Sequence, residues 1–195
     1  MSDYLAPWRS PLARALHRNR SQVFSRYLQL ATVTAQGIPS NRTVVFRGFL
    51  EDSNNLQIIT DLRSEKCQHL QHQPIAEICW YFAKTREQFR LNGKITLINY
   101  QEKNQIFKNS RNKAWDKLSE NAKSQFSWES PGELFQTKTT NNQSTVDLSK
   151  PLDTFCLLIF EPQKVDHLEL KGNPQNRYLY LLKDDQKWTV NQINP

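Results

Sequence analysis

The sequence predicts a mainly β fold, an antiparallel β-barrel with flanking helices, and two observations support this prediction. Short runs rich in β-branched and aromatic residues recur along the chain and are separated by polar turns. Two or three other stretches show the 3.6-residue periodicity of amphipathic helices. Many strands joined by short turns, with helices on the outside, are typical of an antiparallel barrel.

The N-terminal region predicts an amphipathic helix over residues 11–30. Its apolar residues fall near a helical period, and its arginines lie mostly on the other side. These arginines could form a basic clamp near a ligand, but a solvated helix face is the more common use of such a charge pattern. A strand follows at 30–34, and Gln36-Gly37 makes the turn into a second strand at 42–47.

The middle of the chain predicts a hairpin, a helix and two more strands. Strand 42–47 pairs with strand 56–60 across a polar turn, and a helix then runs from Ser64 to about Gln73, where Pro74 stops it. Residues 75–82 are almost continuously apolar, which predicts a buried strand. In residues 88–97 polar and apolar side chains alternate, which predicts a strand with one face exposed to solvent.

The C-terminal half predicts a helical region, a long loop and four strands. Apolar residues recur at helical spacing over residues 104–126, and the polar stretch 127–150 is expected to be an exposed loop. Strands are expected at 154–160 and 165–170, and a last hairpin joins 177–181 to 188–190.

Length, charge and cysteine content limit the class of protein to which this chain can belong. The 195 residues fit one domain spanning 1–195, and the net charge is +7. The basic residues are dispersed, so attraction to a phosphorylated small molecule explains this charge better than nucleic-acid binding. No apolar run is long enough to span a membrane, the N-terminus lacks the core of a signal peptide, and the three cysteines are scattered. These features favour the cytoplasm.

One group of residues points to phosphate binding. The hairpin and the helix after it should bring together Arg42, Thr60, Ser64, Lys66 and the free N–H groups of a helix N-terminus. Cationic side chains, hydroxyls and helix N-termini are the groups that hold a phosphate in proteins.

Three ordered blocks resemble the FMN-binding motifs of the pyridoxamine 5′-phosphate oxidase family, and most closely its divergent branch of oxidase-related FMN-binding proteins. The blocks are R-T-V-V-F-R at residues 42–47, I-I-T-D-L-R-S-E-K at 58–66 and E-Q-F-R-L-N-G at 87–93. Their order and spacing make the match more specific than any single block. The resemblance implies a Greek-key split β-barrel, a homodimer with FMN at its interface, and an oxidoreductase.

The resemblance also assigns expected roles. The expected FMN-binding residues are Arg42, Thr43, Val44, Val45, Arg47, Thr60, Ser64, Lys66, Gln88 and Arg177. Arg47 stands where the family has a lysine, next to both flavin and substrate, and Arg111 is a candidate contact for a substrate anion. The flavin would carry the redox chemistry, so no catalytic nucleophile is expected. The four histidines suggest no metal site.

The sequence also departs from the family pattern. Glu65 replaces an arginine of the phosphate motif, Phe107 lacks a tyrosine hydroxyl, and the R-L-H substrate element is replaced by residues 173–176. Since several polar contacts are lost, substrate specificity should shift. The first expectation is an FMN-dependent oxidase of a CH–NH₂ or related small substrate, such as pyridoxamine or pyridoxine 5′-phosphate. The alternatives are a flavin carrier or redox module without oxidase activity, and a basic interaction protein that binds RNA.

Overall fold

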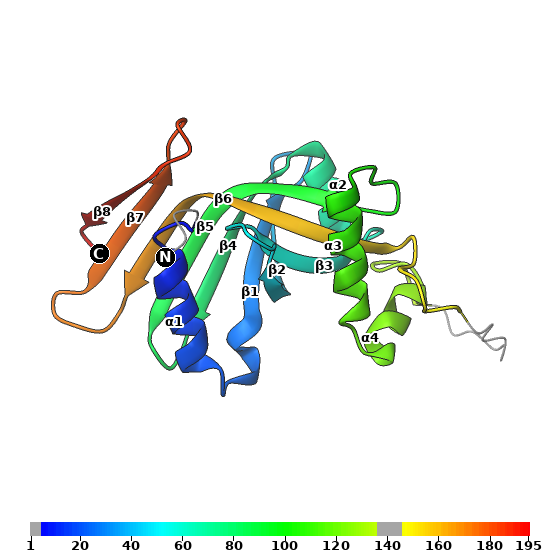
Figure 1. Ribbon diagram of the computed structural model, residues 1–195, viewed down its shortest axis with the longest axis horizontal. Coiled ribbons are helices and arrows are strands. Elements are labelled where there is room, and N and C mark those ends of the chain that lie inside the picture. Colours follow the sequence, from blue (N-terminus) through cyan, green and yellow to red (C-terminus); the bar gives the residue numbers. More distant parts are fainter. Residues whose placement is uncertain (1–4, 136–145) are drawn as a thin grey trace.

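The computed structural model describes residues 5–135 and 146–195 and shows a β-barrel flanked by helices (Figure 1). Part of the loop expected at 127–150 lies outside the described residues. The strands are β1 (Tyr27–Val33), β2 (Pro39–Phe49), β3 (Leu56–Asp61), β4 (Ile75–Phe82), β5 (Glu87–Ile98), β6 (Phe155–Glu169), β7 (Asn176–Leu182) and β8 (Trp188–Ile193). The helices are α1 (Arg9–Asn19), α2 (Glu65–His72), α3 (Gln105–Asp116) and α4 (Glu120–Ser124), with 3₁₀ turns at Val23–Arg26 and Gln125–Ser127.

The sheet closes because β3 pairs with β6. The strand order is β3-β2-β1-β4-β5-β6-β7-β8, and the β3–β6 ladder joins six of these strands into a ring. After the β1-β2-β3 meander the chain returns to the far side of β1 as β4, which gives the 3-2-1-4 order of a Greek key. The predicted antiparallel, Greek-key split-barrel fold is confirmed, and every strand pairing is antiparallel.

Strand β6 separates two apolar clusters. Its alternate residues Cys156, Leu158 and Phe160 point into the barrel core, which α1 also contacts through Leu12 and Ala15. The residues between them, Phe155, Leu157 and Ile159, pack in a second cluster with α3. Because successive side chains of a strand point to opposite faces, β6 is apolar on both faces where it lies between the barrel interior and α3.

The structure corrects three predicted elements. The helix expected over 11–30 ends at Asn19, because Leu28 and Leu30 alternate into the core as part of β1. The helical region 104–126 is divided into α3, α4 and a 3₁₀ turn. The two strands expected at 154–160 and 165–170 are one strand, β6, which contains Pro162 opposite the register shift in β5. A bulge of this kind tolerates proline inside a strand.

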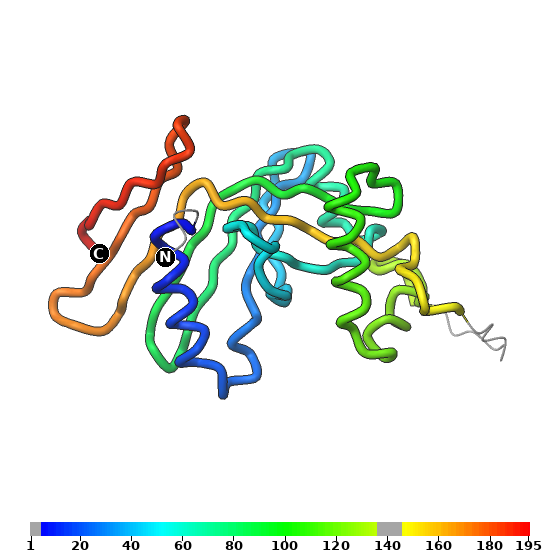
Figure 2. The backbone as a smooth tube through the Cα atoms, viewed as in Figure 1, coloured from blue at the N-terminus to red at the C-terminus, as the bar shows by residue number. Residues whose placement is uncertain are grey.

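The hairpin β7–β8 continues the sheet beyond the closed ring, and the N-terminal segment lies against it. The start of α1 and the C-terminus lie on this side of the molecule (Figure 2). Trp8, just before α1, stacks edge-on against Trp188 at the start of β8, with ring centroids 5.9 Å apart. No helix among the described residues is long and apolar enough to cross a membrane.

Candidate functional site

The predicted phosphate group is assembled where β3 passes into α2. Thr60 is the last inward-facing residue of β3, and Ser64 is the N-cap of α2. The Lys66 Nζ donates to the Thr60 Oγ1 at 3.0 Å, and the Thr60 and Ser64 hydroxyl oxygens lie 3.2 Å apart. Both hydroxyl residues are only 7% exposed. The tight turn between strand and helix therefore places two hydroxyls and an ammonium at one helix N-terminus.

Arg42 reaches the same end of the barrel from β2. Its guanidinium donates to Leu30 O at 2.9 Å, Thr32 Oγ1 at 2.7 Å and Ser40 Oγ at 2.6 Å. The Thr32 hydroxyl also lies 3.0 Å from the Nδ1 of His69 on α2. A guanidinium has about five N–H donors, so these contacts orient Arg42 and leave donors for a ligand.

The electrostatics of this group favour an anion. Burial, followed by the neighbouring Arg42 charge, lowers the pKa of Lys66 despite opposing contributions from nearby acidic groups. Burial likewise lowers the pKa of Arg42, against the attraction of Glu65. A bound phosphate would offset the mutual repulsion and the desolvation of these two cations. The N-terminus of α2 can donate further hydrogen bonds from its first N–H groups to the same phosphate. The Glu65 side chain is 72% exposed and lies 3.7 Å from His69.

Arg47 lies near the end of β2 between two cavities. One has a volume of about 410 Å³ and is lined by Thr60, Asp61 and residues of the α4 region, including Phe126 and Trp128. The other has a volume of about 150 Å³ and lies between the start of β1, β2 and the end of α3. Val44 faces the core, whereas Thr43 and Val45 alternate outward on the same strand.

Gln88 and Arg177 lie apart from this group within one chain. They belong to β5 and β7, and both β1 and β4 separate β5 from β2 in the sheet. The Cys79 thiol donates to the Gln88 side-chain oxygen at 3.8 Å. Arg177 forms a bidentate salt bridge with Asp166, in which Nε donates to Oδ1 at 2.9 Å and Nη2 donates to Oδ2 at 2.7 Å. This salt bridge lowers the pKa of Asp166.

Arg111 occupies a structural position. It is 7% exposed, and its guanidinium donates to Phe155 O at 3.1 and 2.9 Å and to Leu152 O at 2.6 Å. These bonds hold α3 to the segment that leads into β6. Backbone carbonyls thus use the Nε and Nη2 of the residue expected to contact a substrate anion, and Arg111 also lines a cavity of about 290 Å³.

Sequence reasoning missed Arg63, which connects the strand–helix turn to the loop after α4. Its guanidinium pairs with Asp61 at 2.7 Å and donates to Trp128 O at 3.0 Å. This bond spans 65 positions in the sequence. Only the tertiary structure reveals the contact, because nothing in the local pattern around Trp128 indicates which strand it approaches.

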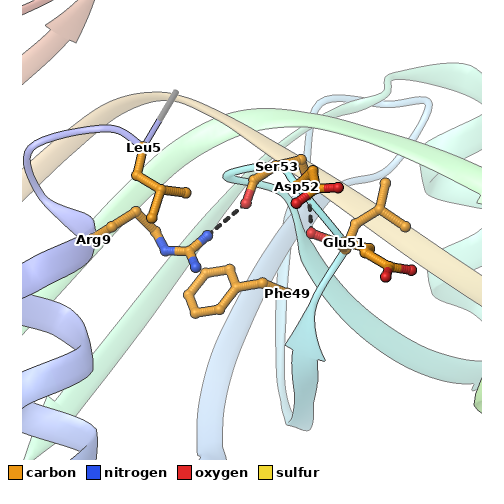
Figure 3. A pocket seen from close by; sticks show the side chains of 7 residues that line it. Leu5, Arg9, Phe49, Glu51, Asp52 and Ser53 are labelled. Atoms are coloured by element: carbon orange, nitrogen blue, oxygen red, sulfur yellow. Dashed lines mark hydrogen bonds between the residues drawn. The ribbon is translucent and has the colours of Figure 1, made fainter. Parts of the chain in front are cut away.

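A larger cavity of about 730 Å³ lies elsewhere, between the N-terminal segment and the β2–β3 turn (Figure 3). The Arg9 guanidinium lies 3.2 Å from the centre of the Phe49 ring and donates to Ser53 O at 2.7 Å. Burial lowers the pKa of Arg9 to about 10. Arg9 therefore connects α1 to the β2–β3 turn and has a structural role in the wall of this cavity. None of the predicted site residues lines the cavity.

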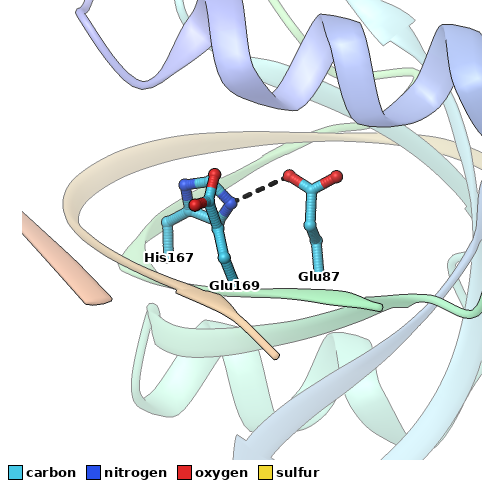
Figure 4. A group of neighbouring side chains, drawn as sticks. All are labelled: Glu87, His167 and Glu169. Carbon is cyan, nitrogen blue, oxygen red and sulfur yellow. Dashed lines mark hydrogen bonds and ion pairs between the residues drawn. The ribbon is translucent and has the colours of Figure 1, made fainter. Parts of the chain in front are cut away.

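Beneath α1 the structure groups Glu87, His167 and Glu169, three side-chain types that can hold a metal (Figure 4). The His167 Nε2 lies 3.0 Å from a Glu87 carboxylate oxygen, and the ring stacks on Phe89 at 4.0 Å. Metal-bound histidines normally donate their second ring N–H to an acceptor. The buried His167 Nδ1 has no partner among the described residues, so a metal at Nε2 would leave that N–H unsatisfied. No local pattern indicates this grouping, because Glu87 and His167 are 80 positions apart.

Comparison with known proteins identifies the family. The chain is 40% identical over its whole length to pyridoxine/pyridoxamine 5′-phosphate oxidase 2 of Arabidopsis thaliana, whose full length is also covered. The chain belongs to the pyridoxamine 5′-phosphate oxidase family. The family model for the pyridoxamine 5′-phosphate oxidase FMN-binding domain matches residues 5–99, which include the Arg42–Lys66 group.

Solved structures agree with this membership. A pyridoxamine 5′-phosphate oxidase-related, FMN-binding protein of Nostoc punctiforme is 52% identical, with a TM-score of 0.93 over 100% of both chains. PhzG of Burkholderia lata, at 18% identity and a TM-score of 0.71 over 99% of this chain and 98% of its own, shares the fold. The expected family and its barrel fold are confirmed, whereas the roles of the individual site residues stay predictions.

Proposed function

We propose that this member of the pyridoxamine 5′-phosphate oxidase family binds FMN and acts as an FMN-dependent oxidoreductase. The Lys66–Thr60–Ser64 group at the α2 N-terminus, with Arg42 beside it, is the observation that carries the proposal. Two cations, two hydroxyls and the first N–H groups of a helix suit the phosphate of FMN. The name of the 52% identical Nostoc punctiforme relative supports the same cofactor.

Each site is proposed to draw on two copies of the chain. Gln88, expected at the flavin ring system, and Arg177 lie on strands β5 and β7, and their side chains bond Cys79 and Asp166 rather than the described residues of the Arg42–Lys66 group. A homodimer with FMN at the interface would bring these residues of one copy to the phosphate group of the other. The Gln88 amide can then both donate to and accept from a flavin edge.

The chemistry proposed is the oxidation of a CH–NH₂ or related small substrate, with pyridoxamine and pyridoxine 5′-phosphate as the first candidates. Bound FMN supplies hydride acceptance and reaction with O₂. The chain supplies binding, orientation and shielding from water. Arg47 and the 410 Å³ cavity beside Thr60 offer a place for the substrate, and the Arg63–Trp128 contact fixes one of its walls.

A flavin-binding protein without oxidase activity is the second candidate. The observation that favours it is that backbone carbonyls use the Nε and Nη2 donors of Arg111, which leaves fewer donors for the expected substrate contact. We expect either form in the cytoplasm, since all three cysteines are free. Small-molecule ligands remain the proposed partners, and no nucleic acid or membrane is proposed.

The visible absorption spectrum of the purified protein, followed by FMN titration, tests this proposal. We expect flavin bands or saturable FMN binding, and a loss of affinity of about tenfold or more in Arg42→Ala, because charge-assisted contacts to phosphate are strong. An absence of both flavin bands and FMN binding would refute the proposal. Bound, reducible flavin without turnover of pyridoxamine 5′-phosphate would select the second candidate.

A further inference from the structure

The smaller cavity beside Arg47 is lined by three cations from separate parts of the chain. Arg26 comes from the 3₁₀ turn before β1, Arg47 from β2, and Lys117 from the end of α3. Among the residues that the structure describes, no acidic one lines this cavity. The remaining lining is Val45, Phe46, Gln57, Ala114 and Leu118. The fold therefore brings three positive charges to one cavity, and no local sequence motif predicts this arrangement.

These cations lack partners among the described residues. None of the three forms a hydrogen bond or ion pair with another described side chain or backbone group. Burial lowers the pKa of Arg47, and the nearby charge of Arg26 lowers it further. All three residues are exposed to solvent, and like charges gathered at one place on a surface attract an anion.

The size of the cavity limits what can enter it. Its volume of about 150 Å³ equals the share of roughly five water molecules, at about 30 Å³ each. A compact tetrahedral anion fits this space, whereas a flavin or pyridine ring with its substituents needs the 410 Å³ cavity that Arg47 also lines. Arg47 lines both cavities and can contact the two parts of a single ligand.

We propose that Arg26 and Lys117, with Arg47, form a subsite for the phosphate monoester group of the substrate, while the body of the substrate lies in the larger cavity. This inference rests on the proposed function. It assigns anion recognition to Arg26 and Lys117, in place of the Arg111 contact that the family pattern suggested. Three cations suit a dianion, and Arg26 and Arg47 can each offer paired N–H donors.

Lys117 also has a competing structural use, because it caps the C-terminal end of α3, where a positive charge stabilises the helix dipole. Lys113 in the last turn of the same helix is a matched control, since it lies outside the cavity and pairs with Glu51. Arg18, exposed on α1, is the corresponding control for Arg26.

The test compares pyridoxamine 5′-phosphate with pyridoxamine, which lacks the phosphate, as ligands of the flavin-loaded full chain. Flavin content and FMN affinity are measured first, and binding is then followed by the change in flavin absorbance. Arg26→Gln and Lys117→Gln should each weaken pyridoxamine 5′-phosphate binding by about tenfold and leave pyridoxamine binding unchanged. Inorganic phosphate should compete with pyridoxamine 5′-phosphate in the wild type and not in the double variant.

Three outcomes would overturn the subsite. They are a wild type that binds both ligands equally, an Arg26→Gln/Lys117→Gln double variant that keeps the full preference for the phosphorylated ligand, and equal losses in the Lys113→Gln and Arg18→Gln controls. If the double variant instead loses FMN affinity, the cavity serves the cofactor and this inference fails. If the wild type does not bind FMN at all, the proposed function itself is refuted. Failure of the phosphate subsite and failure of the proposed function therefore give different results.

Discussion

The Lys66 ammonium lies 3.0 Å from the Thr60 hydroxyl and ties the first turn of α2 to the last inward residue of β3. This contact spans the short turn on which the proposed phosphate site depends. Removing the ammonium should therefore affect FMN through its phosphate rather than through the ring system.

Lys66→Ala is expected to weaken FMN binding by about ten- to a hundredfold, because it removes a charge-assisted contact to phosphate. Thr60→Val should have a smaller effect of the same sign. Titration with FMN and with riboflavin, which has no phosphate, separates the contributions. Riboflavin affinity should not change, and Lys103→Ala in an exposed loop is the control. An equal loss for both flavins would contradict a phosphate contact.

The pH dependence of FMN binding should follow Lys66. Its folded pKa lies below the ordinary value of 10.5, so the ammonium is lost at a lower pH than in an exposed lysine. FMN affinity should then fall as pH rises through that lowered pKa. The flavin-free protein should behave oppositely, because the unfolded chain binds more protons between the two pKa values and stability therefore rises with pH there. Titrations of wild type and Lys66→Ala between neutral and alkaline pH check both signs; identical profiles would contradict them.

The Arg177–Asp166 pair should contribute to acid stability. The pKa of Asp166 is lowered mainly by its bond to Arg177, so the stabilisation is present above the ordinary value of 3.8 and is lost as pH falls through the lowered pKa. Asp166→Asn should cost about 2 kcal/mol at neutral pH, as bonds to charged groups do, and less in acid. Urea unfolding at several pH values measures this. Glu77→Gln, which breaks the more exposed pair with Arg90, should cost under about 1 kcal/mol.

A shared site predicts complementation between two defective variants. Arg42→Ala and Gln88→Ala would each damage every site of their own dimers. In mixed dimers one site would receive both substitutions and the other neither. After equal mixing and exchange of subunits, about a quarter of all sites should regain wild-type FMN affinity, since about half the dimers are mixed. No recovery in a preparation shown to contain mixed dimers would contradict an interface site.

Gly93 should tolerate no side chain. A Cβ at this position would lie 2.1 Å from the backbone oxygen of Glu161 on β6, at the bulge where the two strands come close. Gly93→Ala should lower the free energy of unfolding by about 3 kcal/mol or more. Gly37→Ala is the comparison, because nothing lies within 4 Å there and only its φ of +81° opposes a side chain. Equal stability losses would rule out the close approach as the cause.

Several elements followed from local sequence alone. Apolar and β-branched runs correctly predicted β2, β3, β4 and the β7–β8 hairpin, alternation correctly predicted β5, and Pro74 correctly placed the end of α2. The prediction failed where local periodicity was ambiguous. Residues 27–30 continue a helical apolar spacing, yet pairing with both β2 and β4 makes them a strand. The two strands expected at 154–160 and 165–170 are continuous, because the bulge opposite Gly93 lets β6 include Pro162.

For the site, local sequence was enough to predict the Arg42–Lys66 group, because a hairpin and the helix that follows it bring neighbouring residues together over a short stretch of chain. The other contacts depend on tertiary packing. This packing buried Arg111 against backbone carbonyls, connected Arg63 to Trp128, and set Arg26 and Lys117 beside Arg47. These contacts join residues that are 21 to 70 positions apart in different elements, and their positions depend on how the helices pack on the closed barrel, which no local pattern encodes.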